Sequence, residues 1–255
     1  MNILEKKENI LFLILGGFFV SNAIIAEFIG VKIFSLENTL GFDSFSYTVF
    51  GELMSFNLTA GVVIWPVVFI MTDIINEYFG IKGVRFLSFL AVGLISYAFL
   101  IVIFAIHLSP ATWWVKSAIS EGVPNFQFAF QKIFGQGLWI IIGSLVAFLI
   151  GQSIDVKVFQ KLKSLTGEKK IWLRATGSTL VSQLIDSFIV LFIAFKIGAD
   201  WSWSLLIAVG LNNYIFKFLI AIVLTPLIYF SHAIIDWYLG EDLAHHLKEE
   251  ALRNT

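Results

Sequence analysis

The chain has 255 residues, of which 58% are hydrophobic and only 14% are charged, and its mean hydropathy is +0.87. A soluble domain normally carries about 25% charged residues because its surface faces water, so this composition excludes a soluble globular protein. The net charge of −1 predicts no attraction to nucleic acid, and the absence of cysteine excludes disulfides, thiolate metal sites and a cysteine nucleophile.

The apolar residues form blocks of about twenty, the length that crosses a hydrocarbon core of about 30 Å. Six spans follow one another along the chain, at about 10–30, 58–77, 84–107, 136–155, 175–197 and 203–230. The first is preceded by Lys6 and Lys7, as a secretion signal would be, but it is long and lacks a small-residue cleavage site. We therefore expect one all-α domain over residues 1–255, a polytopic bundle of about six transmembrane helices in the lipid bilayer.

Three segments lie outside these spans. The loop after the first span carries Glu37, Asp43 and Glu52. The segment 108–135 is too polar to span a membrane, but its tryptophans and phenylalanines are typical of a segment at the membrane interface. Residues 231–255 alternate apolar and charged residues, which predicts an amphipathic helix along the membrane surface.

Lysine and arginine positions predict the orientation of the bundle. With the N-terminus inside, twelve basic residues fall on the cytoplasmic side and four on the other, while Lys217 lies within the last span. Cytoplasmic loops of membrane proteins carry an excess of such residues. An even number of spans also places both termini on one side, so we expect a multi-pass protein of the cytoplasmic (inner) membrane with both termini in the cytoplasm.

Two ionisable residues fall near the middle of their spans, Asp186 in the fifth and Lys217 in the sixth. A charge at that depth costs about 2.5–3.5 kcal/mol on insertion scales. Each interface lies about 20 Å from position 217 at 1.5 Å per residue, too far for a lysine to reach. We expect the two side chains to face one another or a shared polar cavity that also receives Gln183 and Asn213. A structural ion pair and a role in binding substrate or a coupling proton both remain open.

A polar stripe ends the second span, where Asp73, Asn76, Glu77 and Gly80 recur at three- and four-residue spacing. Two carboxylates and an amide on one helix face make a platform of hydrogen-bond acceptors, although a solvated helix end would have the same composition. Glu77 is expected to be the better partner for a ligand. Pro66, placed in mid-span, is predicted to kink the helix and free backbone carbonyls.

For the other polar residues, the sequence fits a purely structural role as well as a role in binding. Asn22 in the first span fits an interhelical hydrogen bond as well as a ligand contact. Arg174 fits a cytoplasmic anchor as well as a binding residue. His245 and His246 lie in a charged tail and are interpreted as surface residues, and we expect no metal site and no cofactor.

Known catalytic motifs are missing from the sequence. There is no phosphate-binding Gly-Lys-Ser/Thr loop, no Gly-x-Ser-x-Gly and no His-Glu-x-x-His. The polar residues inside the spans therefore favour transport of a small molecule over catalysis.

The ordered set of polar residues resembles the queuosine precursor transporters, a family also described as vitamin-uptake-like. The resemblance covers most of the chain and is carried by Asn22, Pro66, Thr72-Asp73-x-x-Asn76-Glu77-x-x-Gly80, Arg85, Gly151-Gln152-x-x-Asp155, Trp172-x-Arg174, Ser178-Thr179, Gln183-x-x-Asp186-Ser187, Tyr214-x-x-Lys217 and Thr225-Pro226. It implies import of 7-cyano-7-deazaguanine or its aminomethyl relative, the precursors of queuosine. Which of the two is carried, and whether the protein forms a homo-oligomer, is left open.

The chemistry of such a deazapurine defines the candidate substrate-binding residues. Its edge offers an N–H and an amine that one carboxylate accepts together, a carbonyl that needs a donor, and a ring that aromatic side chains stack on. The candidates are Asn22, Asp73, Asn76, Glu77, Gln152, Asp155, Arg174, Gln183, Asp186, Asn213 and Lys217. Two alternatives stay open: the substrate-binding membrane subunit of an ATP-driven vitamin importer, and a membrane enzyme or scaffold.

Overall fold

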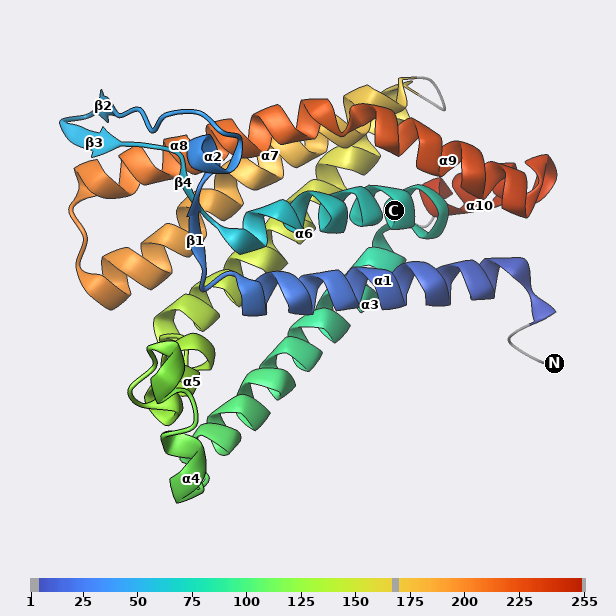
Figure 1. The fold of residues 1–255 in the computed structure, drawn as a ribbon. Coiled ribbons are helices and arrows are strands. Elements are labelled where there is room, and N and C mark those ends of the chain that lie inside the picture. The colour runs from blue at the N-terminus through green and yellow to red at the C-terminus, as the bar shows by residue number, and fades with distance from the viewer. Residues whose placement is uncertain (1–4, 167–169, 254–255) are drawn as a thin grey trace.

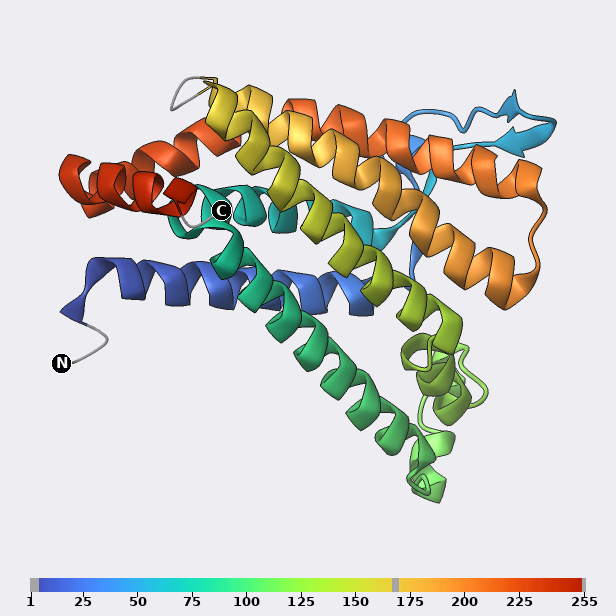
Figure 2. The same cartoon turned by 180° about the vertical axis from the view of Figure 1, so that it is seen from behind.

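The computed structural model describes residues 5–166 and 170–253 of the chain. Its body is a bundle of long apolar helices, α1 (Lys7–Ile29), α3 (Trp65–His107), α6 (Leu138–Thr166), α7 (Ile171–Leu191) and α8 (Trp203–Val223). In the described residues, five helical segments are long and apolar enough to cross a membrane. Figure 1 and, from behind, Figure 2 show α7 and α8 side by side, with α6 and the second segment of α3 running obliquely to α1. The predicted class, a polytopic helical membrane protein, is confirmed.

The helix α3 supplies two of the six predicted spans, because it breaks at Gly80. This residue has φ 66° and ψ −170°, a backbone conformation that is essentially restricted to glycine. The segments on either side, 65–79 and 81–107, run in different directions from this point (Figure 1). The mid-span kink predicted at Pro66 is wrong. Pro66 lies in the first turn of α3, where a proline is tolerated because its missing N–H has no helical partner.

A methyl group at Gly80 is expected to destabilise this break. The φ/ψ region costs a non-glycine residue about 1–3 kcal/mol, and a Cβ there would lie 3.0 Å from the backbone oxygen of Ala251. We expect Gly80→Ala to lower the unfolding temperature of the purified protein in detergent. The matched control is Gly93→Ala in the same helix, where a Cβ would meet nothing within 4 Å. Equal unfolding temperatures for the two variants would contradict the conclusion that the break in α3 depends on glycine at position 80.

Residues 30–63 form a small folded cap, where the sequence predicted a loop followed by the start of the second span at about 58; that predicted start is wrong, because α3 begins at Trp65. They comprise β1 (Ile33–Ser35), α2 (Leu36–Thr39), β2 (Tyr47–Val49), β3 (Glu52–Met54), β4 (Asn57–Thr59) and the 3-10 helix η2 (Ala60–Val63). The strands pair antiparallel, β1 with β4 through Phe34 and Leu58, and β2 with β3 through Thr48 and Leu53. The Glu37 carboxylate accepts hydrogen bonds from the Phe56 backbone N–H at 2.9 Å and from the Ser35 hydroxyl at 2.9 Å.

The hydrogen bond from the Phe56 backbone keeps the pKa of Glu37 below its ordinary value, so the carboxylate stays charged at neutral pH. This buried charge ties α2 to the turn that precedes β4. The cap is therefore held together by its own hydrogen bonds and strand pairs.

The cap is also fastened along α8 by polar contacts. The Ser204 hydroxyl donates to Glu52 at 2.7 Å, and the Asn212 amide donates to the backbone oxygen of Ser55 at 3.1 Å. Asn212 also accepts a hydrogen bond from the Tyr47 hydroxyl. Figure 1 shows the cap, in blue, beside α8 at the end of the bundle opposite the chain termini.

The segment between α3 and α6 consists of short helices and does not form a membrane span. It holds α4 (Thr112–Val115), the 3-10 helix η3 (Ile119–Glu121) and α5 (Phe126–Phe134). Trp114 packs edge-on against Phe126 with ring centroids 5.1 Å apart, whereas Trp113 is 73% exposed. These helices cluster where α3 ends and α6 begins (Figure 2). The exposed aromatic residues fit the predicted interfacial position.

The C-terminal segment folds back on the bundle. After the π-helical turn η4 (Phe192–Ile197) and α8, the helix α9 (Thr225–Leu239) leads into α10 (Glu241–Arg253). Ala244, Leu247 and Ala251 are buried, and α10 packs against α3 near Gly80. The predicted amphipathic helix therefore exists, but its apolar face covers this end of the bundle. The start of α1 lies at the same end (Figure 1).

Candidate functional site

A cavity lies between the first segment of α3, α7 and α8. It has about 490 Å³ of space free of protein atoms, a figure that includes the part open to solvent. The wall is mainly apolar, with three aromatic rings and a few polar groups. Its lining residues are Val62, Trp65, Pro66, Phe69, Ile70, Asp73, Ala175, Thr176, Thr179, Gln183, Phe216, Lys217, Ala221, Leu224 and Ile228.

Two polar side chains of this wall have hydrogen-bonding atoms without partners. Asp73 and Gln183 are each 2% exposed. Within residues 5–166 and 170–253, no group bonds to Asp73 Oδ1 or to Gln183 Nε2 and Oε1. Buried polar groups are bonded in the great majority of cases because an unmade hydrogen bond costs about 1–3 kcal/mol. The cavity therefore presents an acceptor from α3 and both a donor and an acceptor from α7.

The predicted pairing of Asp186 and Lys217 is confirmed. Lys217 Nζ lies 2.8 Å from Asp186 Oδ2 and 3.1 Å from the Ser187 hydroxyl, which joins α7 to α8. The side chains are 17% and 19% exposed, for Lys217 and Asp186 respectively. Lys217 and Gln183 line the cavity together, whereas Asp186 and Asn213 are not among the lining residues.

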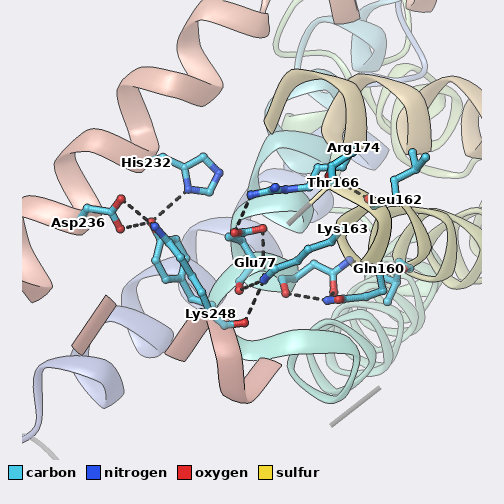
Figure 3. Close-up of polar contacts among 12 residues, drawn as sticks. Glu77, Gln160, Leu162, Lys163, Thr166, Arg174, His232, Asp236 and Lys248 are labelled. Carbon is cyan, nitrogen blue, oxygen red and sulfur yellow. Dashed lines mark hydrogen bonds and ion pairs between the residues drawn. The ribbon is translucent and has the colours of Figure 1, made fainter. Parts of the chain in front are cut away.

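Glu77 lies one turn beyond Asp73 and belongs to a separate ionic network. Arg174 Nη2 lies 2.7 Å from Glu77 Oε1, and Lys163 Nζ lies 3.4 Å from Oε2. Lys163 also donates to the backbone oxygens of Glu77 at 2.9 Å and Lys248 at 3.2 Å. Figure 3 shows Glu77 between Arg174 and Lys163. All three side chains are at most 1% exposed, and none lines the cavity.

The network continues toward the chain termini through α9 and α10. The Tyr78 hydroxyl donates to Asp236 at 2.7 Å and lies 3.1 Å from His232 Nδ1. Lys248 of α10 binds the other oxygen of Asp236 at 2.8 Å (Figure 3). This end of the bundle is therefore closed by ion pairs and hydrogen bonds that connect α3, α6, α7, α9 and α10.

Three further candidates, Gln152, Asn76 and Asp155, form interhelical contacts and do not line the cavity. Gln152 accepts from the Thr72 hydroxyl at 3.0 Å, and Asn76 accepts from the Gln160 amide at 2.6 Å, so both join α3 to α6. Asp155 accepts from the Ser182 hydroxyl at 2.9 Å and joins α6 to α7.

Asn22 donates to the backbone oxygen of Phe18 in its own helix at 2.7 Å, and it does not line the cavity. His245 and His246 are exposed, and each lies 3.9 Å from a glutamate one turn later in α10. Among the described residues, no group of three or more acidic or histidine side chains is placed to hold a metal ion.

Sequence reasoning missed Lys163 and the aromatic wall of the cavity. Lys163 was counted only among the basic residues that set the orientation. The spacing of Lys163 from Asp155 and Phe159 indicated that it is buried. These residues are four and eight positions apart, so all three lie on one buried face of α6. Trp65, Phe69 and Phe216 gave no comparable signal, because aromatic residues at helical spacing are common on any transmembrane helix.

A bundle of apolar helices around a buried cavity with a few polar groups defines a membrane transport protein rather than a soluble binding protein. A family model described as "putative vitamin uptake transporter" matches residues 59–231. The chain belongs to this family, which is one of transporters and not of enzymes. Its substrate is accordingly a small molecule.

Three curated relatives carry more specific names. A probable queuosine precursor transporter of Bacillus subtilis (strain 168) is 29% identical over 187 residues, which are 70% of this chain and 73% of the relative. A protein of the same name from Haemophilus influenzae is 30% identical over 175 residues, 67% of this chain and 66% of the relative. The queuosine precursor transporter of Escherichia coli (strain K12) is 27% identical over 176 residues, 68% and 71% of the two chains.

No solved structure matches this chain significantly. The family resemblance drawn from the polar residues is confirmed by the family model and by these relatives.

Proposed function

We propose that this protein imports a queuosine precursor, 7-cyano-7-deazaguanine or 7-aminomethyl-7-deazaguanine, through the cavity between α3, α7 and α8. The names of three relatives support the substrate class. The observation that carries the proposal is the unsatisfied set of Asp73 and Gln183 atoms on the cavity wall.

Each part of the cavity matches a feature of a deazaguanine. The Asp73 carboxylate accepts the ring N–H and the exocyclic amine together, and the Gln183 amide supplies one donor and one acceptor. Trp65, Phe69 and Phe216 offer faces or edges for the ring. We therefore place the substrate on Asp73 and Gln183, with Lys217 beside them.

Glu77 has a different role in this proposal from the one its sequence position suggested. Its carboxylate is bound by Arg174 and Lys163 and is separated from the cavity by one helical turn. We assign this network, with α10, to the closure of the cytoplasmic end. The excess of basic residues at that end supports a cytoplasmic position of both termini. Release of substrate then requires these ion pairs to separate.

Asp73→Asn tests the site. The substitution keeps the shape but replaces a charged acceptor by an amide, and loss of a hydrogen bond to a charged group costs about 1.5–3 kcal/mol. We expect affinity for the deazapurine to fall roughly tenfold to hundredfold, as measured by calorimetry on the purified protein. The matched control is Asp200→Asn, where the side chain is 95% exposed. Asp73→Asn protein with wild-type affinity would remove Asp73 from the site.

Uptake by the purified chain in liposomes separates the rival functions. Transport without any partner protein is expected, and it excludes a subunit that depends on a partner ATPase. Chemically unchanged substrate inside the vesicles excludes a membrane enzyme. A screen with both deazapurines, guanine and vitamins distinguishes the proposed substrate from that of a vitamin transporter.

A further inference from the structure

The buried charges next to the cavity do not balance. Among the described residues, this buried group holds three carboxylates, Asp73, Glu77 and Asp155, and two cationic groups, Lys163 and Arg174, and each of the five side chains is at most 2% exposed. With all five groups ionised, their formal charges sum to −1. Asp186 and Lys217 neutralise one another separately. A buried net charge is costly in a low-dielectric interior, so this group of residues is suited to binding one positive charge.

Among the described residues, neither Asp155 nor Asp73 has a cationic side chain in direct contact, and of these two only Asp155 lies away from the cavity. Glu77 is paired with Arg174 and Lys163, and Asp73 lines the substrate cavity. Asp155 instead faces a hydroxyl group of α7, because Ser182 donates to its Oδ1 at 2.9 Å. No described residue bonds to its Oδ2, although the side chain is 0% exposed.

The surroundings of Oδ2 indicate which positive charge fits. This oxygen is sealed from solvent, and Asp155 does not line the cavity. A hydrated metal ion would need space and further oxygen ligands, whereas a proton needs only the free lone pair. The charged and titratable groups on the elements packed against this part of α6 are Asp73 and Glu77 on α3, Arg174 and Asp186 on α7, and Lys163 two turns along α6 itself.

We propose that Asp155 is a proton-binding site that couples uptake of the substrate to uptake of one proton. The proposal rests on the proposed function, because it takes the occupant of the Asp73 cavity to be the transported substrate. A proton from the outer solution forms an O–H bond on Asp155 Oδ2 and brings the charge of the five residues to zero. Asp73 then stays ionised to bind substrate, and the proton passes to cytoplasmic water after the bundle reopens inward.

The carboxylates of Asp155 and Asp73 influence each other through their charges. The charge of Asp155 acts on Asp73 across the contact between α3 and α6. While Asp155 is ionised, its negative charge and that of Asp73 repel one another. Protonation of Asp155 removes this repulsion, so the proton and the substrate favour each other's binding. This reciprocity is what coupled transport requires.

Accumulation in proteoliposomes tests the coupling. With wild-type protein and labelled 7-cyano- or 7-aminomethyl-7-deazaguanine, an inside-alkaline pH gradient is expected to drive accumulation above equilibrium, and a protonophore to abolish it. A sodium gradient is expected to drive none. Sodium-driven accumulation, or the absence of any response to the pH gradient in protein that binds substrate, would overturn the proposal.

Asp155→Asn, which mimics the protonated group, is expected to exchange labelled for unlabelled substrate but to lose gradient-driven accumulation. The matched control is Glu27→Gln: Glu27 is also a buried carboxylate that accepts from a serine hydroxyl, Ser144 at 2.9 Å, but it lies in α1. It is expected to keep accumulation. The reverse pattern, with accumulation lost in Glu27→Gln and kept in Asp155→Asn, would place the proton on α1 and refute the assignment.

A second variant covers the case in which Asp155→Asn fails to fold. Ser182→Ala removes the hydroxyl that donates to Asp155, so it is expected to shift the pH at which uptake is half-maximal without changing substrate affinity at saturating proton concentration. An unshifted pH profile would contradict the assignment. The proposed function fails separately, if the wild-type protein binds neither deazapurine.

Discussion

Replacing Arg174 with glutamine is expected to destabilise the protein by about 3–5 kcal/mol, the usual cost of leaving a buried charge without its partner. Arg174 is 1% exposed and contacts Glu77 at 2.7 Å. Without it, Asp73, Glu77 and Asp155 share Lys163 as their remaining cation, so the charge of the cluster changes from −1 to −2. Denaturant unfolding of purified protein in detergent measures the loss.

A second substitution separates charge from packing. Arg174→Gln combined with Glu77→Gln returns the charge of the cluster to −1, so it is expected to recover part of the lost stability. Arg174→Lys, which keeps the charge, should cost less than Arg174→Gln. If the double variant were less stable than Arg174→Gln by the full effect of Glu77→Gln alone, the two side chains would be energetically independent, and the ion pair would not hold this end closed.

The second large effect is expected when the ion pair of Asp186 and Lys217 is broken, and it is a loss of membrane abundance. Replacing either residue with a neutral one leaves a charge near mid-membrane, which costs about 2.5–3.5 kcal/mol on insertion scales. We expect Asp186→Asn and Lys217→Met each to reduce membrane abundance several-fold. The double variant should insert at close to wild-type abundance, because it carries no orphaned charge.

Uptake by the double variant decides what the pair does. Lys217 lines the cavity beside Gln183, so we expect the double variant to be inactive at matched abundance even though it inserts. The control is Lys196→Met with Asp200→Asn, an ion pair of 3.0 Å at the end of η4 in which the Asp200 side chain is 95% exposed, and it should leave uptake unchanged. Normal uptake by the Asp186 and Lys217 double variant would reduce the pair to a structural contact.

The membrane-spanning architecture and this ion pair were predictable from the sequence for one physical reason. The hydrocarbon core accepts few charges, so apolar blocks of fixed length mark the spans, and a charge inside a span must find a partner at its own depth. Asp186 and Lys217 sit at matching depth in consecutive antiparallel helices. Their contact follows from depth alone, without knowledge of helix rotation.

The site itself was predicted less completely. Asp73 and Glu77 share one stripe of α3, and sequence spacing gave no means to divide their roles. In the folded bundle Asp73 reaches the cavity, whereas Glu77, one turn further along α3, meets Arg174 and Lys163. Which neighbour each side chain meets depends on how α6 and α7 are rotated and shifted against α3.

The sequence by itself determined the membrane class, the positions of the spans and the residues capable of polar chemistry, because the bilayer acts on each segment locally through its hydropathy and length. Only the tertiary structure decided that Gly80 and not Pro66 breaks α3, that residues 30–63 fold along α8, and that α10 closes one end. It also decided that Asp73 and Gln183 keep unused hydrogen-bonding atoms in a cavity while Glu77 does not line it. These features depend on contacts between segments far apart in the chain, which no local pattern specifies.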